Sequence, residues 1–141
     1  SPCQRDGKSL TADSQGGPVA NILIIDDSPT DVRVFTTLLE RAGHQNDAVS
    51  SAEEGIERVR AQQPDLVIMD VIMPGMNGFQ ATRTLTRDPL TKNVPVVMIT
   101  TKSMETDRVW GMRQGARAFI TKPVNEKELL GCINDLLSSG T

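Results

Sequence analysis

Short apolar segments alternate along the chain with segments in which apolar residues recur at helical spacing. The apolar segments lie at 21–25, 47–49, 66–69, 94–99 and 117–120. Strands this short and apolar on both faces are typical of a parallel sheet that helices cover on two sides. The pattern therefore predicts an α/β fold, doubly wound, with five parallel strands and five helices. The strand at 47–49 is the weakest and is expected at an edge of the sheet.

Capping residues mark where several helices begin and end. Ser28 precedes Pro29 and puts Asp31 in the first turn, where an acid faces the positive end of the helix. Gly43 and Pro64 are placed to end the first and second helices. The other helices are expected to follow a capping box at 51–54, to cover 78–87 and 103–114, and to follow a cap at Asn125.

The helical spacing also predicts which side chains of the first and last helices are buried. These side chains are Val32, Phe35 and Leu39 in the first helix and Leu129, Ile133, Leu136 and Leu137 in the last. Cys132 is expected to pack along the last helix, because two cysteines are too few for a disulfide framework or a metal cage.

Length and composition indicate one ordinary domain. The chain has 141 residues, of which 38% are hydrophobic and 23% charged, and this size is enough for a core without disulfides. Residues 1–18 lack periodicity and end in a Gly-Gly-Pro sequence. They are expected to form a flexible tail or an added segment, which leaves 19–141 for the domain.

Charge and hydropathy exclude two classes of partner. A net charge of −3 without basic runs gives no footprint for nucleic acid. No apolar run approaches the roughly 20 residues of a membrane span, so no membrane insertion is expected. No signal-peptide pattern opens the chain, and a cytoplasmic location is therefore expected.

Three acids end predicted strands on the same side of the sheet. Asp26 and Asp27 follow the first strand and Asp70 follows the third. Ligands of open parallel sheets bind beyond the carboxyl ends of the strands, and neighbouring strands lie about 4.8 Å apart. If the first and third strands are neighbours, the three carboxylates converge and favour a bound Mg²⁺ ion. In the alternative interpretation each acid only solvates a strand end.

Two further strand ends carry groups that suit phosphate chemistry. Thr100 offers a hydroxyl after the fourth strand, and Lys122 offers a compact cation after the fifth. Pro123 makes the preceding peptide bond a candidate for the cis form. Taken singly, Thr100 and Lys122 are also common as a strand-end hydroxyl and a solvated lysine.

These motifs together resemble the response-regulator receiver family. The resemblance rests on Asp26-Asp27, Asp70 with the sequence MPGMNG at 73–78, Thr100, and Lys122-Pro123, and it covers about 120 residues. It implies a CheY-like, flavodoxin-like sheet with strand order 2-1-3-4-5.

The resemblance also implies a role for each matching residue. Asp70 would be the phospho-acceptor. Asp27, Asp70 and the backbone carbonyl of Ile72 would bind Mg²⁺ (or Mn²⁺), and Asp26 would act on the metal through a water.

A second set of positions would bind the phosphoryl group and transmit the signal. Thr100, the backbone of Thr101 and Lys122 would bind phosphoryl oxygens, and Phe119 would stand at the position of the family's switch aromatic. Two features depart from the commoner pattern: Thr101 is bulkier than Ala or Gly, and Phe119 lacks the hydroxyl of Tyr.

The family resemblance implies a single-domain response regulator that accepts a phosphoryl group from a histidine kinase of the CheA type. It would act on a downstream motility or regulatory protein through the face formed by the fourth helix, fifth strand and fifth helix. The domain would lose its phosphate by self-dephosphorylation, would not be an enzyme with a separate substrate, and would be a monomer or weak dimer. The sequences 77–83, 100–102, 105–111, 114–117 and 121–124 further resemble the twitching-motility regulators of type IV pili (PilH type).

Two other functions are compatible with parts of this pattern. An aspartyl-phosphate phosphatase places a second acid two residues after its nucleophile, where this chain has Ser28. A degenerate receiver that only binds proteins would not need the full acidic set with Thr100 and Lys122.

His44, the only histidine, is expected to be a solvated loop residue, whereas Trp110 fits either the core or an exposed anchor for a partner.

Overall fold

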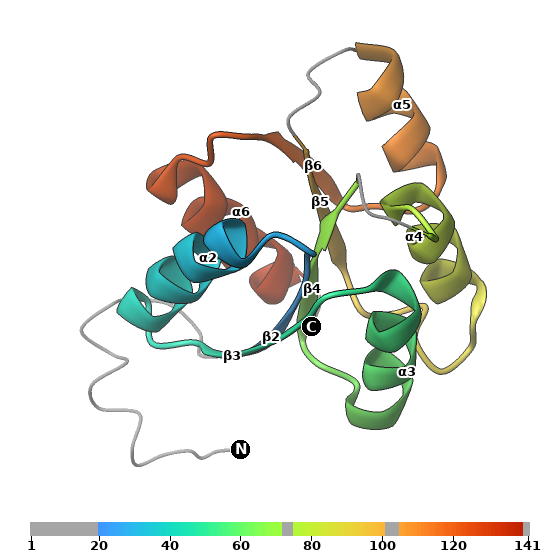
Figure 1. The fold of residues 1–141 in the computed structure, drawn as a ribbon, viewed down its shortest axis with the longest axis horizontal. Coiled ribbons are helices and arrows are strands. Elements are labelled where there is room, and N and C mark those ends of the chain that lie inside the picture. Colours follow the sequence, from blue (N-terminus) through green and yellow to red (C-terminus); the bar gives the residue numbers. More distant parts are fainter. Residues whose placement is uncertain (1–19, 72–74, 101–104, 140–141) are drawn as a thin grey trace.

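The computed structural model describes residues 20–71, 75–100 and 105–139. Five strands alternate with five helices in these ranges, and Figure 1 shows the helices on both sides of a central sheet. The expected flexible tail at 1–18 lies outside the described residues.

All strands of the sheet are parallel, in the order β3-β2-β4-β5-β6. The strands are β2 (Asn21–Ile25), β3 (Gln45–Val49), β4 (Leu66–Asp70), β5 (Val96–Thr100) and β6 (Ala118–Thr121). Numbered along the chain, this order is 2-1-3-4-5, as the family resemblance implied. The weak strand β3 lies at the edge, and β4 lies at the centre with all five residues buried.

The helices divide between the two faces of the sheet. They are α2 (Pro29–Arg41), α3 (Ala52–Gln62), α4 (Gly78–Arg87), α5 (Glu105–Arg113) and α6 (Glu126–Ser139). Helices α2 and α6 cover one face, and α3, α4 and α5 cover the other (Figure 1). Alternate strand residues supply two separate cores, so that Ile24 and Ile68 pack on the α2 side and Ile25 and Met69 on the other.

Side chains cap the helices where the sequence predicts. The Ser28 hydroxyl accepts a hydrogen bond from the Asp31 backbone at 3.4 Å, and the Ser51 hydroxyl accepts one from Glu54 at 3.2 Å. Asn77 and Gln80 form a reciprocal capping box at the start of α4, a cap that was not predicted from the sequence. Such caps fix where each chain segment leaves the sheet and enters a helix.

Most differences from the predicted elements are shifts of one or two residues. Strand β5 begins at Val96 rather than at 94, and β6 runs one residue later than predicted. Val32, Leu136 and Leu137 are only partly buried, whereas Phe35, Leu39, Leu129 and Ile133 are buried as expected.

One residue prediction was wrong. His44 is buried rather than solvated, and its Nδ1 accepts a hydrogen bond from the backbone N–H of Ala20 at 3.1 Å. The ring therefore joins the start of β3 to the start of β2.

Trp110 on α5 is half exposed, which favours the surface interpretation over the core. Among the described residues, no helix combines the length and the apolar character that crossing a bilayer requires.

Candidate functional site

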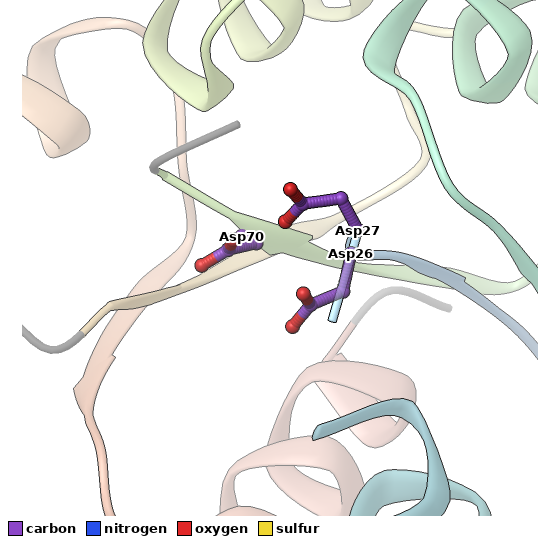
Figure 2. Close-up of side chains that lie close together, drawn as sticks. All are labelled: Asp26, Asp27 and Asp70. Carbon is purple, nitrogen blue, oxygen red and sulfur yellow. The ribbon is translucent and has the colours of Figure 1, made fainter. Parts of the chain in front are cut away.

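The predicted acidic cluster forms at the carboxyl ends of β2 and β4. Ile25 pairs with Met69 in the sheet, so Asp26 and Asp70 are the next residues along two neighbouring strands. One carboxylate oxygen from each of Asp26, Asp27 and Asp70 lies within 4.8 Å of the other two. Figure 2 shows these three side chains together at the strand ends.

The three acids differ in exposure because the local backbone holds them differently. The Asp26 side chain is buried, and its Oδ1 accepts a hydrogen bond from the Ser28 backbone at 2.9 Å. Asp70 is also buried, whereas Asp27 is exposed. Asp26 and Asp70 thus form the floor of the site and Asp27 borders the solvent.

Lys122 brings a positive charge to this cluster from the end of β6. Its Nζ lies 3.3 Å from Asp70 Oδ1 and 3.4 Å from Asp26 Oδ2. The Lys122 backbone N–H donates to the Thr100 carbonyl at 2.7 Å, which joins the ends of β5 and β6. The peptide bond between Lys122 and Pro123 is cis.

A fourth acid, Asp31, also belongs to the site, although its sequence position predicts only an acid in the first turn of α2. Asp31 Oδ2 lies 2.6 Å from Lys122 Nζ, which is the shortest of the three contacts of this ammonium group. The sequence signal for this role was the position of Asp31, four residues after Asp27 and in the first turn of α2.

Burial and like charges dominate the electrostatics of the acids. Burial first, and then the charge of Asp26, raise the pKa of Asp70 to about 6 against the opposing effect of Lys122. Burial also raises the pKa of Asp26, although the Ser28 hydrogen bond and the Lys122 charge oppose it. Burial alone would lower the pKa of Lys122, but Asp31, Asp70 and Asp26 together raise it.

The donor set fits a hard divalent cation. It consists of three carboxylates, two of them buried, and such oxygen ligands are those that Mg²⁺ and Mn²⁺ prefer. Burial and then the Asp26 charge raise the pKa of Asp70, and a bound cation would offset the repulsion between these acids. Asp26, Asp27 and Asp70 are therefore the residues that could hold a metal.

The start of α4 lies directly against the end of β4. A Cβ atom on Gly78 would lie 2.4 Å from the carbonyl oxygen of Asp70, and the Gly78 backbone N–H donates to the Val71 carbonyl at 2.9 Å. Only a glycine allows this approach. The helix start and the end of β4 are thereby held as one unit.

The remaining predicted site residues lie near this unit or outside the described ranges. Thr100 is buried at the end of β5. Phe119 is partly buried on β6, and its ring lies 3.1 Å from where a Cβ on Gly111 of α5 would stand. The positions of Ile72 and Thr101 fall outside the described residues.

Comparison with known proteins gives consistent matches. A profile of the response regulator receiver domain matches residues 22–134. The chain is 52% identical to the protein PilH of Pseudomonas aeruginosa over 120 residues, which are 85% of this chain and 99% of PilH. It spans between 26% and 52% of the length of the next curated relatives.

Solved structures share the fold. The signal receiver domain of a signal transduction histidine kinase from Syntrophus aciditrophicus has a TM-score of 0.79 and 36% identity, covering 86% of this chain and 92% of that one. The chemotaxis protein CheY4 of Vibrio cholerae has a TM-score of 0.78 and 26% identity, covering 84% and 99%. With the profile match across most of its length, this chain belongs to the family of response regulator receiver domains.

Proposed function

We propose that this chain is a response regulator that accepts a phosphoryl group on Asp70 from a histidine kinase, with Mg²⁺ bound beside it. The observation that carries the proposal is the position of Asp70: a buried carboxylate with two further acids and a lysine around it. A structural salt bridge would need one acid for one lysine, whereas this site concentrates three described acids around Lys122.

In the proposed reaction a carboxylate oxygen of Asp70 attacks the phosphorus of a phosphohistidine on the kinase. The new P–O bond forms as the P–N bond breaks, and the histidine nitrogen leaves with the bonding electron pair. Lys122 donates hydrogen bonds to the transferred group and offsets its charge. Water later hydrolyses the acyl phosphate and restores the Asp70 carboxylate, so the signal is transient and the domain turns over no separate substrate.

Asp26, Asp27 and Asp70 would hold the metal. When bound, Mg²⁺ would supply positive charge that stabilises the transferred phosphoryl group. The protein holds these carboxylates close together. Lys122 and the Ser28 backbone N–H favour their ionised forms, against the effect of burial on the pKa values of Asp70 and Asp26.

We further propose that the chain acts in control of type IV pilus twitching motility, because PilH is a full-length relative. The kinase would be of the CheA type and the location cytoplasmic. Phosphorylation would alter the surface formed by α5, β6 and α6, that is, the strand that ends just before Lys122 and the helices before and after it in the chain. A motility or regulatory protein would bind there.

The phosphorylation step can be tested with acetyl phosphate and Mg²⁺, followed by intact mass spectrometry. The wild-type chain should gain the mass of one phosphoryl group, and hydroxylamine should remove it. Asp70→Asn should gain none. Asp65→Asn is a matched control, because Asp65 lies at the opposite end of the same sheet and should not affect incorporation. Incorporation in Asp70→Asn equal to wild type would exclude Asp70 as the acceptor.

The pathway can be tested in the organism that carries this gene. Deletion should change the twitching zone on agar, and the wild-type gene should restore it while the Asp70→Asn gene should not. Normal twitching after deletion would exclude the motility assignment without affecting the phosphorylation chemistry.

A further inference from the structure

Lys122 has more acidic partners than it can keep once a phosphoryl group arrives. Its ammonium group has three N–H donors, and three carboxylates lie within 3.4 Å of it, from Asp31, Asp70 and Asp26. A phosphoryl oxygen that is to be bound by Lys122 must therefore displace at least one of these carboxylates.

Asp31 is the partner best suited to be displaced. Its side chain is 34% exposed, whereas those of Asp70 and Asp26 are 8% and 1% exposed. Water can hydrate the Asp31 carboxylate after release, while an unpaired buried carboxylate would be costly. Asp31 nevertheless makes the shortest contact with Lys122, at 2.6 Å, so this contact opposes the displacement.

The backbone of Asp31 is held in place while its side chain remains near the solvent. Ser28 caps α2 through the Asp31 backbone N–H, and the Ser28 carbonyl accepts a hydrogen bond from Val32 at 3.0 Å. Movement on ligand binding would thus involve the two side chains rather than the helix.

We propose that Asp31 is a positioning residue that holds Lys122 in the unphosphorylated protein and competes with the phosphoryl group for it. The inference rests on the proposed function and adds a residue that tunes it. Asp31 is absent from the group of three carboxylates that could hold a cation, so it acts on that group through charge and through Lys122.

Removing the Asp31 charge has opposite consequences for the two ligands of the site. An anion at Asp70 gains, because Lys122 is released to it and one repelling charge is gone. A cation among the three acids loses, because the local negative charge falls and Lys122 moves closer to Asp70 and Asp26. A variant that merely loosened the fold would weaken the binding of both ligands.

The experiment compares the wild-type chain with Asp31→Asn by calorimetry, using Mg²⁺ alone and then beryllofluoride at saturating Mg²⁺. The variant should bind Mg²⁺ more weakly and beryllofluoride more tightly, each by roughly two- to fivefold, the range expected from removing one partly exposed ion pair. Glu40→Gln is the matched control: it removes one charge from the exposed far end of α2 and should change neither affinity. Asp31→Glu keeps the charge and should keep most of the competition.

The outcomes separate this inference from the proposed function. A wild-type chain that binds no beryllofluoride would contradict the proposed function itself. A wild-type chain that binds it, with Asp31→Asn binding equally or more weakly, would overturn the role of Asp31 alone. Melting temperatures measured in parallel identify a folding defect, and in that case Asp31→Ser provides a second neutral variant for the same comparison.

Discussion

The buried carboxylate of Asp70 lowers the stability of the folded protein at neutral pH. Burial and the nearby Asp26 charge raise its pKa from 3.8 to about 6. In the unfolded chain the same carboxyl group ionises near pH 3.8. Between pH 3.8 and about 6 the folded protein therefore keeps a proton on Asp70 that the unfolded chain has lost. The contribution of Asp70 to stability is thus fully present below about pH 4 and is lost as the pH rises through about 6.

Asp70→Asn should therefore raise the melting temperature at neutral pH in the absence of divalent cations. A shift of about two pKa units corresponds to on the order of 2–3 kcal/mol, an upper limit because the variant also loses the contact with Lys122. Thermal unfolding across pH should show the advantage shrinking toward pH 4. Glu57→Gln, on the exposed side of α3, is the control and should have little effect at any pH. Equal melting temperatures of wild type and Asp70→Asn at neutral pH would contradict the prediction that the Asp70 carboxylate destabilises the fold.

His44 should have the opposite pH dependence. Its Nδ1 must stay unprotonated to accept the Ala20 N–H, and burial lowers its pKa below 6.5. Since the unfolded chain takes up the proton first, the stability contributed by His44 is complete above pH 6.5 and is lost as the pH falls through the lowered folded pKa.

The substitution His44→Asn tests this pH dependence, because the asparagine amide oxygen can replace Nδ1 as acceptor but does not titrate. In an Asp70→Asn background the His44 protein should lose stability below about pH 6.5, and His44→Asn should not. His44→Leu leaves the Ala20 N–H unpaired and should cost about 1–3 kcal/mol even at neutral pH. Identical acid profiles for His44 and His44→Asn would show that the imidazole is not the titrating group.

At the residue scale, predictability from sequence followed from position on a strand. Asp26 and Asp70 were predictable because a parallel sheet places the residues that end neighbouring strands together. Asp31 was not, because an acid in the first turn of a helix already has an adequate explanation in the helix dipole. His44 was mispredicted because its partner, Ala20, is 24 residues away in the chain and its neighbours along the sequence are polar or Gly.

The elements were largely predictable, because apolar runs and caps mark them directly. Helix α4 runs from Gly78 to Arg87 as predicted, and its start is a capping box. The sequence did not reveal why Gly78 follows that cap. The reason is a tertiary contact, the approach of the helix to the Asp70 carbonyl at the end of β4.

Substitution by alanine should have opposite effects at two helix glycines, Gly78, which makes this contact, and Gly131, which makes none. In Gly78→Ala the new Cβ would lie 2.4 Å from the Asp70 carbonyl oxygen and 2.8 Å from the Val71 Cα, so the backbone must move. The protein should lose about 1–3 kcal/mol of stability, the usual cost of overpacking. In Gly131→Ala the Cβ meets nothing within 4 Å, so the protein should gain about 0.5–1 kcal/mol from helix propensity. Chemical denaturation measures both. A neutral Gly78→Ala would show that α4 can withdraw from β4 without cost.

At the scale of the whole molecule, the order of the strands brings residues from distant parts of the chain into one site. Acids from β2 and β4, the Thr100 end of β5 and the lysine after β6 meet only because these strands are neighbours in that order. The same order places an aromatic side chain of β6 against α5. Phe119 of β6 packs toward Gly111, the residue that follows Trp110 on α5.

A ligand at Asp70 should therefore change the surroundings of Trp110. An anion at Asp70 attracts Lys122, and the Lys122 backbone is hydrogen-bonded to Thr100. Phe119 lies three residues before Lys122, on the strand β6 that Lys122 directly follows. Beryllofluoride with Mg²⁺ should alter the fluorescence of Trp110, which is half exposed and is the only tryptophan in the chain.

Two variants decide whether the change travels by this route. Asp70→Asn should show no fluorescence change, because it binds no beryllofluoride. Phe119→Leu should bind beryllofluoride but show a smaller change, because the smaller side chain loosens the contact between β6 and Gly111. Fluorine NMR can establish occupancy of Asp70 independently of the tryptophan signal. A Trp110 signal that stays fixed while Asp70 is occupied would remove α5 from the surface that responds to phosphorylation and leave α6 as the remaining helix beside β6.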